Sequence, residues 1–279
     1  MLPKLPLDRW IEALVDWLVD HLSGLFDALS LLINGLVEAF AAVFHAPHPL
    51  LFIAIVAAIG FWLGKWRMAA LTAVGLYAIV NLGFWDETMD TLALVLSSAF
   101  ISIVLGIPLG ILCSRSKTAA RIVTPALDFM QTMPAFVYLI PAVMFFGLGV
   151  VPGVIASVVF AVPPTIRLTH LGIRQVPGEL SEAADAFGST STQKLLKVEL
   201  PLAWPTVMAG VNQTIMLSLS MVVIASMIGA QGVGASVYRA VTQIKIGEGF
   251  EAGLAVVIVA IILDRFTQRM MKSERKRGM

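Results

Sequence analysis

The sequence predicts an all-α integral membrane protein in which about seven spanning helices follow an N-terminal amphipathic helix. Three observations indicate this fold class. Hydrophobic residues make up 58% of the chain and charged residues only 13%, against roughly 25% charged residues in soluble domains. Mean hydropathy is +0.88. Uncharged segments about as long as a bilayer is thick recur along the chain, and Lys and Arg collect in alternate loops.

Residues 1–46 are predicted to form an amphipathic helix on the extracytoplasmic side. At 100° per residue, six polar side chains fall within one narrow arc and apolar ones lie elsewhere around the helix. The polar arc contains Glu12, Asp16, Asp20, Asp27, Asn34 and Glu38. This pattern is typical of a helix that lies in the membrane interface or packs on the spans. If the helix is broken, Gly24 or Gly35 is where we expect the break. An osmotic sensor is an alternative that nothing in the sequence requires.

Uncharged segments of spanning length follow this helix. Two lie within residues 47–85 and are joined by a tight turn at Lys65 and Arg67. Five lie within residues 86–266, where GLGVVPG at 147–153 divides one long apolar run into two spans, because Gly and Pro interrupt helices. The segments are approximately 49–64, 68–85, 91–114, 129–166 (two spans), 203–228 and 252–266. A basic tail, 267–279, follows the last span.

The basic residues predict which loops are cytoplasmic, because Lys and Arg favour that side. With seven spans, four basic segments fall on the same side: the turn at 65–67, the loop after the third span, the loop at 176–201 and the tail. The opposite loops hold acidic residues or balanced charges. We therefore predict that 176–201 and 267–279 are cytoplasmic.

The loop at 176–201 is a polar stretch between two apolar spans, and it is predicted to dock a soluble partner. It contains ELSEAADAFGSTSTQKLLKVELP at 179–201. We expect two short helices on the membrane face, with a turn at Gly188, which can adopt a positive φ. Pro201 can open the next helix. The residues of interest are Glu182, Ala183, Ala184, Gly188, Val198, Leu200 and Pro201. An ordinary solvated loop is the alternative.

Polar residues and prolines inside the spans are candidates for a translocation pathway, because a polar atom in hydrocarbon needs a partner or a wet cavity. The candidates are Gln131, Tyr138, Asn212, Gln213 and Ser220, with Pro134 and Pro163 shaping the helices. Aromatic rings around Gln131 could hold a quaternary ammonium group by cation–π attraction. Hydrogen bonding between helices and simple aromatic packing are the alternatives.

Other function classes find little support in the sequence. A net charge of +1 argues against nucleic-acid binding. Cys113 is the only cysteine and the histidines are scattered, so we predict no metal site and no intramolecular disulfide. No carboxylate pair or Ser/His/Asp arrangement lies in the spans, so we assign no catalytic residues. The chain lacks G-x-x-x-x-G-K-[ST], so it is not expected to bind ATP.

Several runs together identify a family resemblance. The sequences QTMPAFVYLIPAVMFFGLGVVPGVIA, FAVPPTIRLTHLGIRQVP and GVNQTIMLSLSMVVIASMIGAQGVG, with the loop at 176–201, resemble the permease subunit of glycine betaine/proline/choline ABC importers, a binding-protein-dependent transport family. The similarity covers about residues 85 to 265. The loop is similar to the family's EAA signature at matching spacing, with Val198 where Ile is often found.

The resemblance implies a type I ABC importer membrane domain, with the permease core at 86–266. Two copies would enclose one pathway in the bacterial inner membrane, among lipids. Two separate ATPase subunits would bind ATP and Mg and would contact the loop at 176–201, the coupling loop, through its EAA-like residues. An extracytoplasmic binding protein would deliver the solute. The implied cargo is a quaternary-ammonium osmoprotectant, namely glycine betaine, choline or proline betaine, or the related amino acid proline. The alternatives are an importer of the same fold for another solute, such as an amino acid, and a passive channel.

Overall fold

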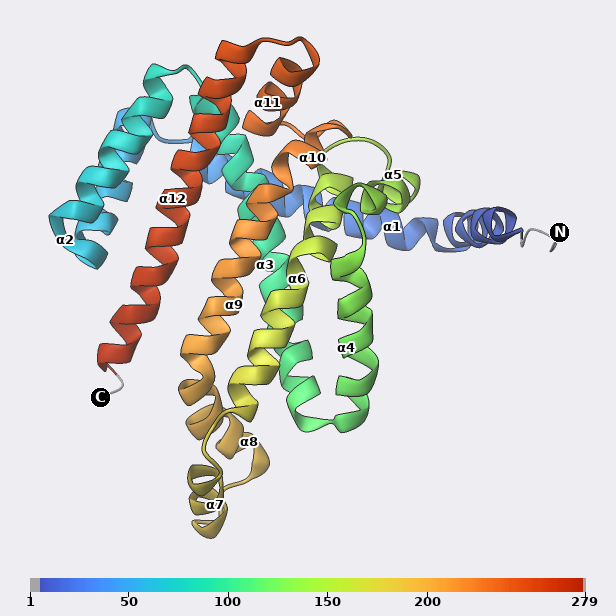
Figure 1. Ribbon diagram of the computed structural model, residues 1–279, viewed down its shortest axis with the longest axis vertical. Coiled ribbons are helices and arrows are strands. Elements are labelled where there is room, and N and C mark those ends of the chain that lie inside the picture. Colours follow the sequence, from blue (N-terminus) through green and yellow to red (C-terminus); the bar gives the residue numbers. More distant parts are fainter. Residues whose placement is uncertain (1–5, 278–279) are drawn as a thin grey trace.

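The computed structural model describes residues 6–277, and these residues form helices joined by short connections, with no strand among them. The elements are α1 (Leu7–His45), α2 (Pro49–Asn81), α3 (Trp85–Arg115), α4 (Lys117–Thr132), η1 (Ala135–Tyr138), α5 (Leu139–Phe146), α6 (Val150–Arg174), α7 (Gly178–Ala186), α8 (Ser191–Lys194), η2 (Leu195–Glu199), α9 (Leu200–Ser220), α10 (Val222–Ser226), α11 (Val233–Thr242) and α12 (Ile246–Arg277). Their order and arrangement are shown in Figure 1.

The N-terminal helix α1 runs across the bundle rather than along it (Figure 1). It packs on α3, α5 and α6, and Phe26 stacks on Phe145 of α5 at 4.8 Å between ring centroids. The helix is continuous from Leu7 to His45, so no break occurs at Gly24 or Gly35. A helix interior tolerates an isolated Gly at a cost of only about 1 kcal/mol.

Helix α2 folds back on itself at Lys65, whose φ of 60° and ψ of −161° are not helical. A Cβ placed on Gly60 would lie 3.4 Å from Thr72 Oγ1, which is possible only if the two halves are antiparallel neighbours. Each half has about 16 residues and is therefore about 24 Å long. The second half ends at Asn81, earlier than expected, because Trp85 already belongs to α3.

The fourth predicted span differs from the structure. We expected it to begin at Phe129, but α4 begins at Lys117, and α4 and the η1–α5 segment are bent by 109° at Met133–Pro134. Pro134 has no N–H to continue the helix, and it favours extended backbone at the residue before it. The expected interruption at 147–153 is confirmed, because Gly147 and Gly149 have positive φ between α5 and α6.

Six helices in the described part of the chain are long and apolar enough to cross a membrane, or seven if the bent α4–α5 pair counts as one span. This set includes α1 and takes α2 as one helix. The last span differs from the prediction at both ends: α12 begins at Ile246, and the helix continues to Arg277 through most of the basic tail. Helix α11 occupies the segment where we expected only a connection, and the predicted span 203–228 is divided at Met221 into α9 and α10.

Helices α3, α6 and α9 form the centre of the bundle and have the most extensive contacts. Glycines allow their backbones to approach closely: a Cβ added to Gly110 of α3 would lie 2.5 Å from Thr169 Cβ of α6. Where α6 and α9 touch, Thr165 and Thr214 share a hydrogen bond of 2.7 Å, and Thr214 also donates to the Ala161 carbonyl. Small residues and hydroxyl groups are the usual means of joining helices in a membrane.

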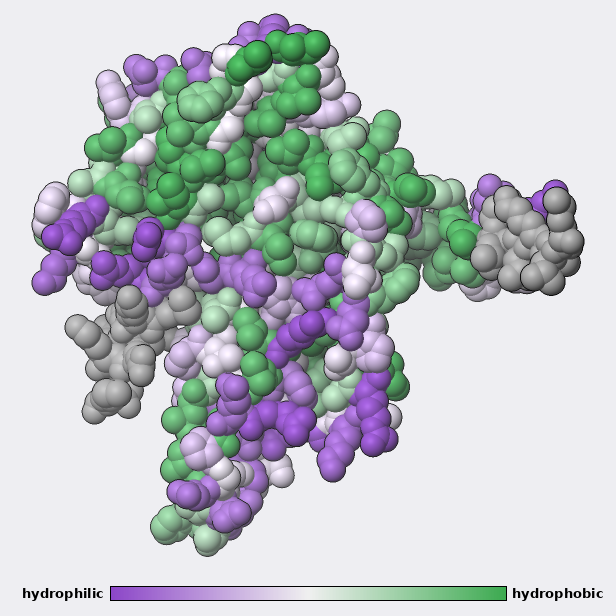
Figure 2. Space-filling view, in the orientation of Figure 1, coloured by the Kyte–Doolittle hydropathy of each residue, from purple (hydrophilic) through white to green (hydrophobic). Residues whose placement is uncertain are grey.

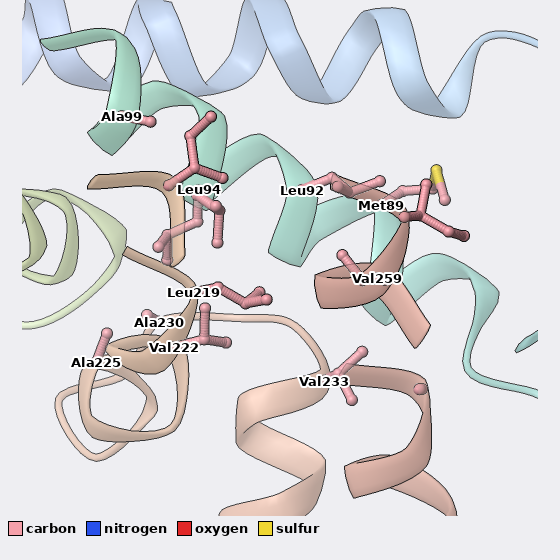
Figure 3. Packing of buried hydrophobic residues seen from close by; sticks show 14 of the residues in the cluster. Met89, Leu92, Leu94, Ala99, Leu219, Val222, Ala225, Ala230, Val233 and Val259 are labelled. Atoms are coloured by element: carbon pink, nitrogen blue, oxygen red, sulfur yellow. The ribbon is translucent and has the colours of Figure 1, made fainter. Parts of the chain in front are cut away.

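The largest apolar cluster lies at the end of the bundle opposite α7. Figure 3 shows Met89, Leu92 and Leu94 of α3 in this cluster, together with Leu219 of α9, Val222 of α10, Val233 of α11 and Val259 of α12. On the face that Figure 2 shows, hydrophobic residues cover much of this end, below a hydrophilic edge, and hydrophilic residues gather toward the other end. An exposed apolar surface of this extent matches a lipid environment.

Gly110→Ala is expected to lower the thermal stability of the detergent-solubilised protein, because the added methyl group overlaps Thr169 and forces α3 away from α6. Overpacking of this kind costs about 1 to 3 kcal/mol. Gly35→Ala is the matched control, since nothing lies within 4 Å of its added Cβ. Size-exclusion chromatography after heating measures both melting temperatures. Equal values would contradict the close contact between α3 and α6.

Candidate coupling loop and translocation pathway

The segment between α6 and α9 projects beyond the bundle as a compact helical unit, at the same end as the C-terminal end of α12 (Figure 1). It consists of α7, α8 and η2, and η2 is a π-helical turn that runs directly into α9. Thr190 and Gln193 form a reciprocal capping box at the start of α8. Such a box satisfies two backbone N–H groups that would otherwise lack partners. The two short helices and their turn match the organisation expected for this loop.

Gly188 forms the turn between α7 and α8. Its φ is +75°, and nothing lies within 4 Å of a Cβ placed on it. Its N–H donates to the Asp185 carbonyl at 2.9 Å. The requirement for Gly at this position therefore comes from backbone conformation and not from lack of space.

An ion pair fixes the loop to the bundle. Arg115, the last residue of α3, donates to Glu199 Oε2 at 2.7 Å and to the Ser191 carbonyl at 3.3 Å. Glu199 is only 7% exposed. A second bridge, between Lys194 and Asp185 at 2.8 Å, holds α8 against α7. The sequence analysis did not predict the role of Arg115. The available signal was Glu199, an acidic residue beside Leu200 and Pro201, because a buried carboxylate needs a partner.

The other EAA-like residues differ in exposure. Glu182 and Ala183 face solvent on α7, whereas Ala184 is buried. Val198 and Leu200 are partly buried at the junction of η2 and α9, and Pro201 is exposed in the first turn of α9, directly after the π-helical turn. The tip of the unit carries Phe187, which is 91% exposed. An exposed aromatic side chain at the tip of a projecting loop is well suited to insertion into a partner's groove.

The seven predicted pathway residues occupy two kinds of environment. Four are exposed: Gln131 and Pro134 at the bend after α4, and Gln213 and Ser220 on α9. The other three, Tyr138, Pro163 and Asn212, are buried or partly buried within the chain. In a single chain, the exposed four are the ones that could face a pathway.

Tyr138 is 8% exposed, and its hydroxyl donates to the Met130 carbonyl across the bend, so it holds α4 against η1. Pro163 is buried inside α6. Asn212 donates to Asp264 Oδ1 of α12 at 3.1 Å. The Asn212 and Thr214 contacts are the hydrogen bonds between helices that we gave as the alternative to a pathway. Among the described residues, no three His, Cys, Asp or Glu side chains are grouped so as to hold a metal ion.

Comparison with protein families places this architecture in a known context. The model for the binding-protein-dependent transport system inner membrane component matches residues 102–273. One solved structure of the MetNI methionine ABC transporter, in an inward-facing conformation, superposes with a TM-score of 0.64 over 68% of this chain and 95% of the other, at 21% identity. Identity this low supports only the fold, which is that of a type I ABC importer membrane domain.

Relatives of higher identity extend over nearly the whole chain. The glycine betaine transport system permease protein OpuAB of Bacillus subtilis is 54% identical over 99% of this chain and 98% of its own length. The glycine betaine/carnitine transport permease protein GbuB of Listeria monocytogenes is 55% identical over 98% of each. The glycine betaine/proline betaine permease protein ProW of Escherichia coli is 47% identical over 98% of this chain and 77% of its own length.

Glu199→Gln is expected to loosen the loop without unfolding the bundle. Removing one partner of a buried pair costs about 3 to 5 kcal/mol, and we reduce this to about 1 to 2 kcal/mol because Arg115 is partly exposed. Amide hydrogen exchange in residues 178–199 should therefore accelerate about five- to thirtyfold. Lys194→Gln, which breaks the bridge to the exposed Asp185, is the control and should change exchange by less than about fivefold. Equal acceleration in both variants would refute a special role for the Arg115 bridge.

Proposed function

The chain belongs to the family of binding-protein-dependent transport system inner membrane components, and we propose that it is the permease of an ATP-driven importer for quaternary-ammonium osmoprotectants. The family match covers residues 102–273, and the protein is a multi-pass protein of the inner membrane. The names of the relatives that match over nearly the full chain support glycine betaine as cargo, with carnitine and proline betaine as related solutes.

The observation that carries the coupling proposal is the projecting unit α7–α8–η2, fixed to α3 by the Arg115–Glu199 bridge. A partner that pulls on this unit moves α6 and α9, which flank it in the chain, and α3 through the bridge. We assign the docking of a separate ATPase subunit to this unit, with Glu182, Ala183 and Phe187 exposed on its surface. ATP and Mg would be bound by that subunit, since this chain carries no phosphate-binding loop.

A second copy of the chain would complete the pathway. The bent α4–α5 segment presents exposed apolar side chains, among them Phe129, Phe136 and Ile140. Gln131 and Pro134 are exposed at the same bend, and Gln213 and Ser220 are exposed on α9. We propose that these surfaces face the axis of a homodimer, with two ATPase subunits below and a binding protein outside. Exposed rings such as Phe136 could attract a quaternary ammonium group, worth about 0.5 to 2 kcal/mol per contact.

Uptake of radiolabelled glycine betaine into vesicles tests the proposal. The chain is reconstituted with its ATPase and its binding protein, each of which is omitted in turn. We expect uptake only when all components and ATP are present, since neither energy nor primary recognition resides in this chain. Choline and methionine are compared as competing solutes. Uptake without ATP would instead indicate a channel, and preferential uptake of methionine would assign another substrate to the same fold.

Gly188→Val tests the coupling unit separately. Positive φ disfavours a residue with a Cβ by about 1 to 2 kcal/mol, and a β-branched side chain is less tolerant still. We therefore expect most ATP-driven uptake to be lost while the protein still inserts and purifies normally. Gly178→Val is the matched control, because Gly178 lies in the same unit, has equal space around it and lacks the positive φ. Normal uptake by Gly188→Val would show that the turn at Gly188 is not needed for coupling.

A further inference from the structure

A basic cavity lies between the turn of α2 and the last turns of α12. We call it the arginine cup. It has a volume of about 290 Å³ and is lined by Arg67, Met68, Leu71, Arg265, Gln268 and Arg269. The turn of α2 and the C-terminal end of α12 lie on the same side of the molecule (Figure 1). Figure 2 shows hydrophilic residues gathered in this region, directly below the hydrophobic surface.

The positive charge of the arginine cup is not balanced by neighbouring side chains. Among the side chains that the structure describes, no carboxylate oxygen lies within 4.0 Å of the Arg67, Arg265 or Arg269 guanidinium groups. The adjacent acid, Asp264, accepts instead from Gln268 Nε2 at 2.9 and 2.8 Å and from Asn212. Three guanidinium groups around one cavity are suited to phosphate oxygens, which they can bind in bidentate fashion.

Two rows of exposed apolar side chains extend from the arginine cup toward the other end of the bundle. On α12, Leu254, Val257 and Ile261 precede Arg265 at helical spacing, so they share one face with it. On α2, Leu71 is followed by the exposed Val74. The cup thus lies at the charged end of an apolar surface. A water-soluble partner could cover that surface only by entering the apolar part of the membrane.

Tryptophan residues indicate where the arginine cup lies relative to the membrane surface. The Arg67 guanidinium lies 5.9 Å from the centre of the Trp66 ring, and both Trp62 and Trp66 are exposed beside the turn. Tryptophan collects at the boundary between hydrocarbon and headgroups. The loop charges place this end on the cytoplasmic side, where the leaflet is rich in anionic lipids.

We propose that the arginine cup binds the headgroup of an anionic phospholipid of the cytoplasmic leaflet, with the acyl chains along the two apolar rows. The phosphate contacts Arg67, Arg265 and Arg269 together, so the lipid joins the α2 turn to α12. A zwitterionic lipid brings its own cation and leaves the three positive charges only partly compensated. Basic pockets between membrane helices on this side are known to suit such headgroups.

Native mass spectrometry of the purified full chain tests this site. Dioleoyl phosphatidylglycerol and dioleoyl phosphatidylcholine are titrated separately, and the affinity of the first bound lipid is measured. We expect phosphatidylglycerol to bind at least about tenfold more tightly. The triple variant Arg67→Gln, Arg265→Gln, Arg269→Gln should lose most of this preference, because each arginine near the surface contributes about fivefold in affinity.

A matched variant separates a site from general surface charge. Lys117→Gln, Arg121→Gln, Arg174→Gln removes three basic groups that line a different cavity, between α3, α4 and α6 at the same end of the molecule. It should keep the phosphatidylglycerol preference. A third variant, Arg67→Lys, Arg265→Lys, Arg269→Lys, keeps the charge but loses the planar guanidinium groups, and should bind with intermediate affinity.

Three outcomes would overturn the proposal. Equal loss in both glutamine variants would mean that anionic lipid follows overall charge. Displacement of the first lipid by millimolar inorganic phosphate would mean that the cup binds free phosphate. Unchanged lipid affinity in the cup variant, with melting temperature and elution volume also unchanged, would mean that the lipid binds elsewhere. Because lipid binding is measured without ATPase, binding protein or substrate, failure here leaves the transport proposal untouched.

Discussion

The close contact of α3, α6 and α9 is the constraint on which the rest of the structure depends. Inside a bilayer, apolar burial does not drive helices together, so they associate through tight packing and shared hydrogen bonds. Gly110 against Thr169, and Gly210 against the backbone of α6 near Thr165, bring the three helices together. The Thr165–Thr214 hydrogen bond satisfies two hydroxyl groups at that contact. The resulting unit can move as one body, which a mechanically driven transporter needs.

The projecting loop, α7–α8–η2, is held firmly because it is attached to this central unit. Its first helix follows α6 and its last turn continues into α9, so both ends are attached to the central unit. The Arg115–Glu199 bridge adds α3 to the same attachment. A displacement of α7 by an ATPase would therefore reach all three central helices. By contrast, the α4–α5 segment is connected through a bend and two positive-φ glycines, so it is the part best able to change its angle between states.

Sequence patterns predicted the membrane class, the turn at Lys65, the interruption at 147–153 and the helix–turn–helix form of the loop. Composition and the positions of Gly and Pro can be read from short stretches of sequence, so these features could be predicted. The α4–α5 bend was not predicted, because the hydropathy of a segment does not show where the chain changes direction. The loop site was only partly predictable: Gly188 follows from spacing, whereas the Arg115–Glu199 pair joins residues 84 positions apart. For the same reason, no pattern shows whether Asn212 faces a pathway or Asp264.

The most direct test of the central claim is chemical cross-linking of this chain to its ATPase in vesicles. Cys113 is the only cysteine and is buried, so Phe187→Cys and Ile244→Cys in a Cys113→Ala background place single thiols at opposite ends of the molecule. Both positions are highly exposed. A reagent that joins the cysteine thiol, through a maleimide, to a lysine amine of the ATPase, through an N-hydroxysuccinimide ester, should cross-link position 187 and should not cross-link position 244. A cross-link from 244 alone would contradict the coupling proposal, because the α7–α8–η2 unit would then lie on the wrong side of the membrane.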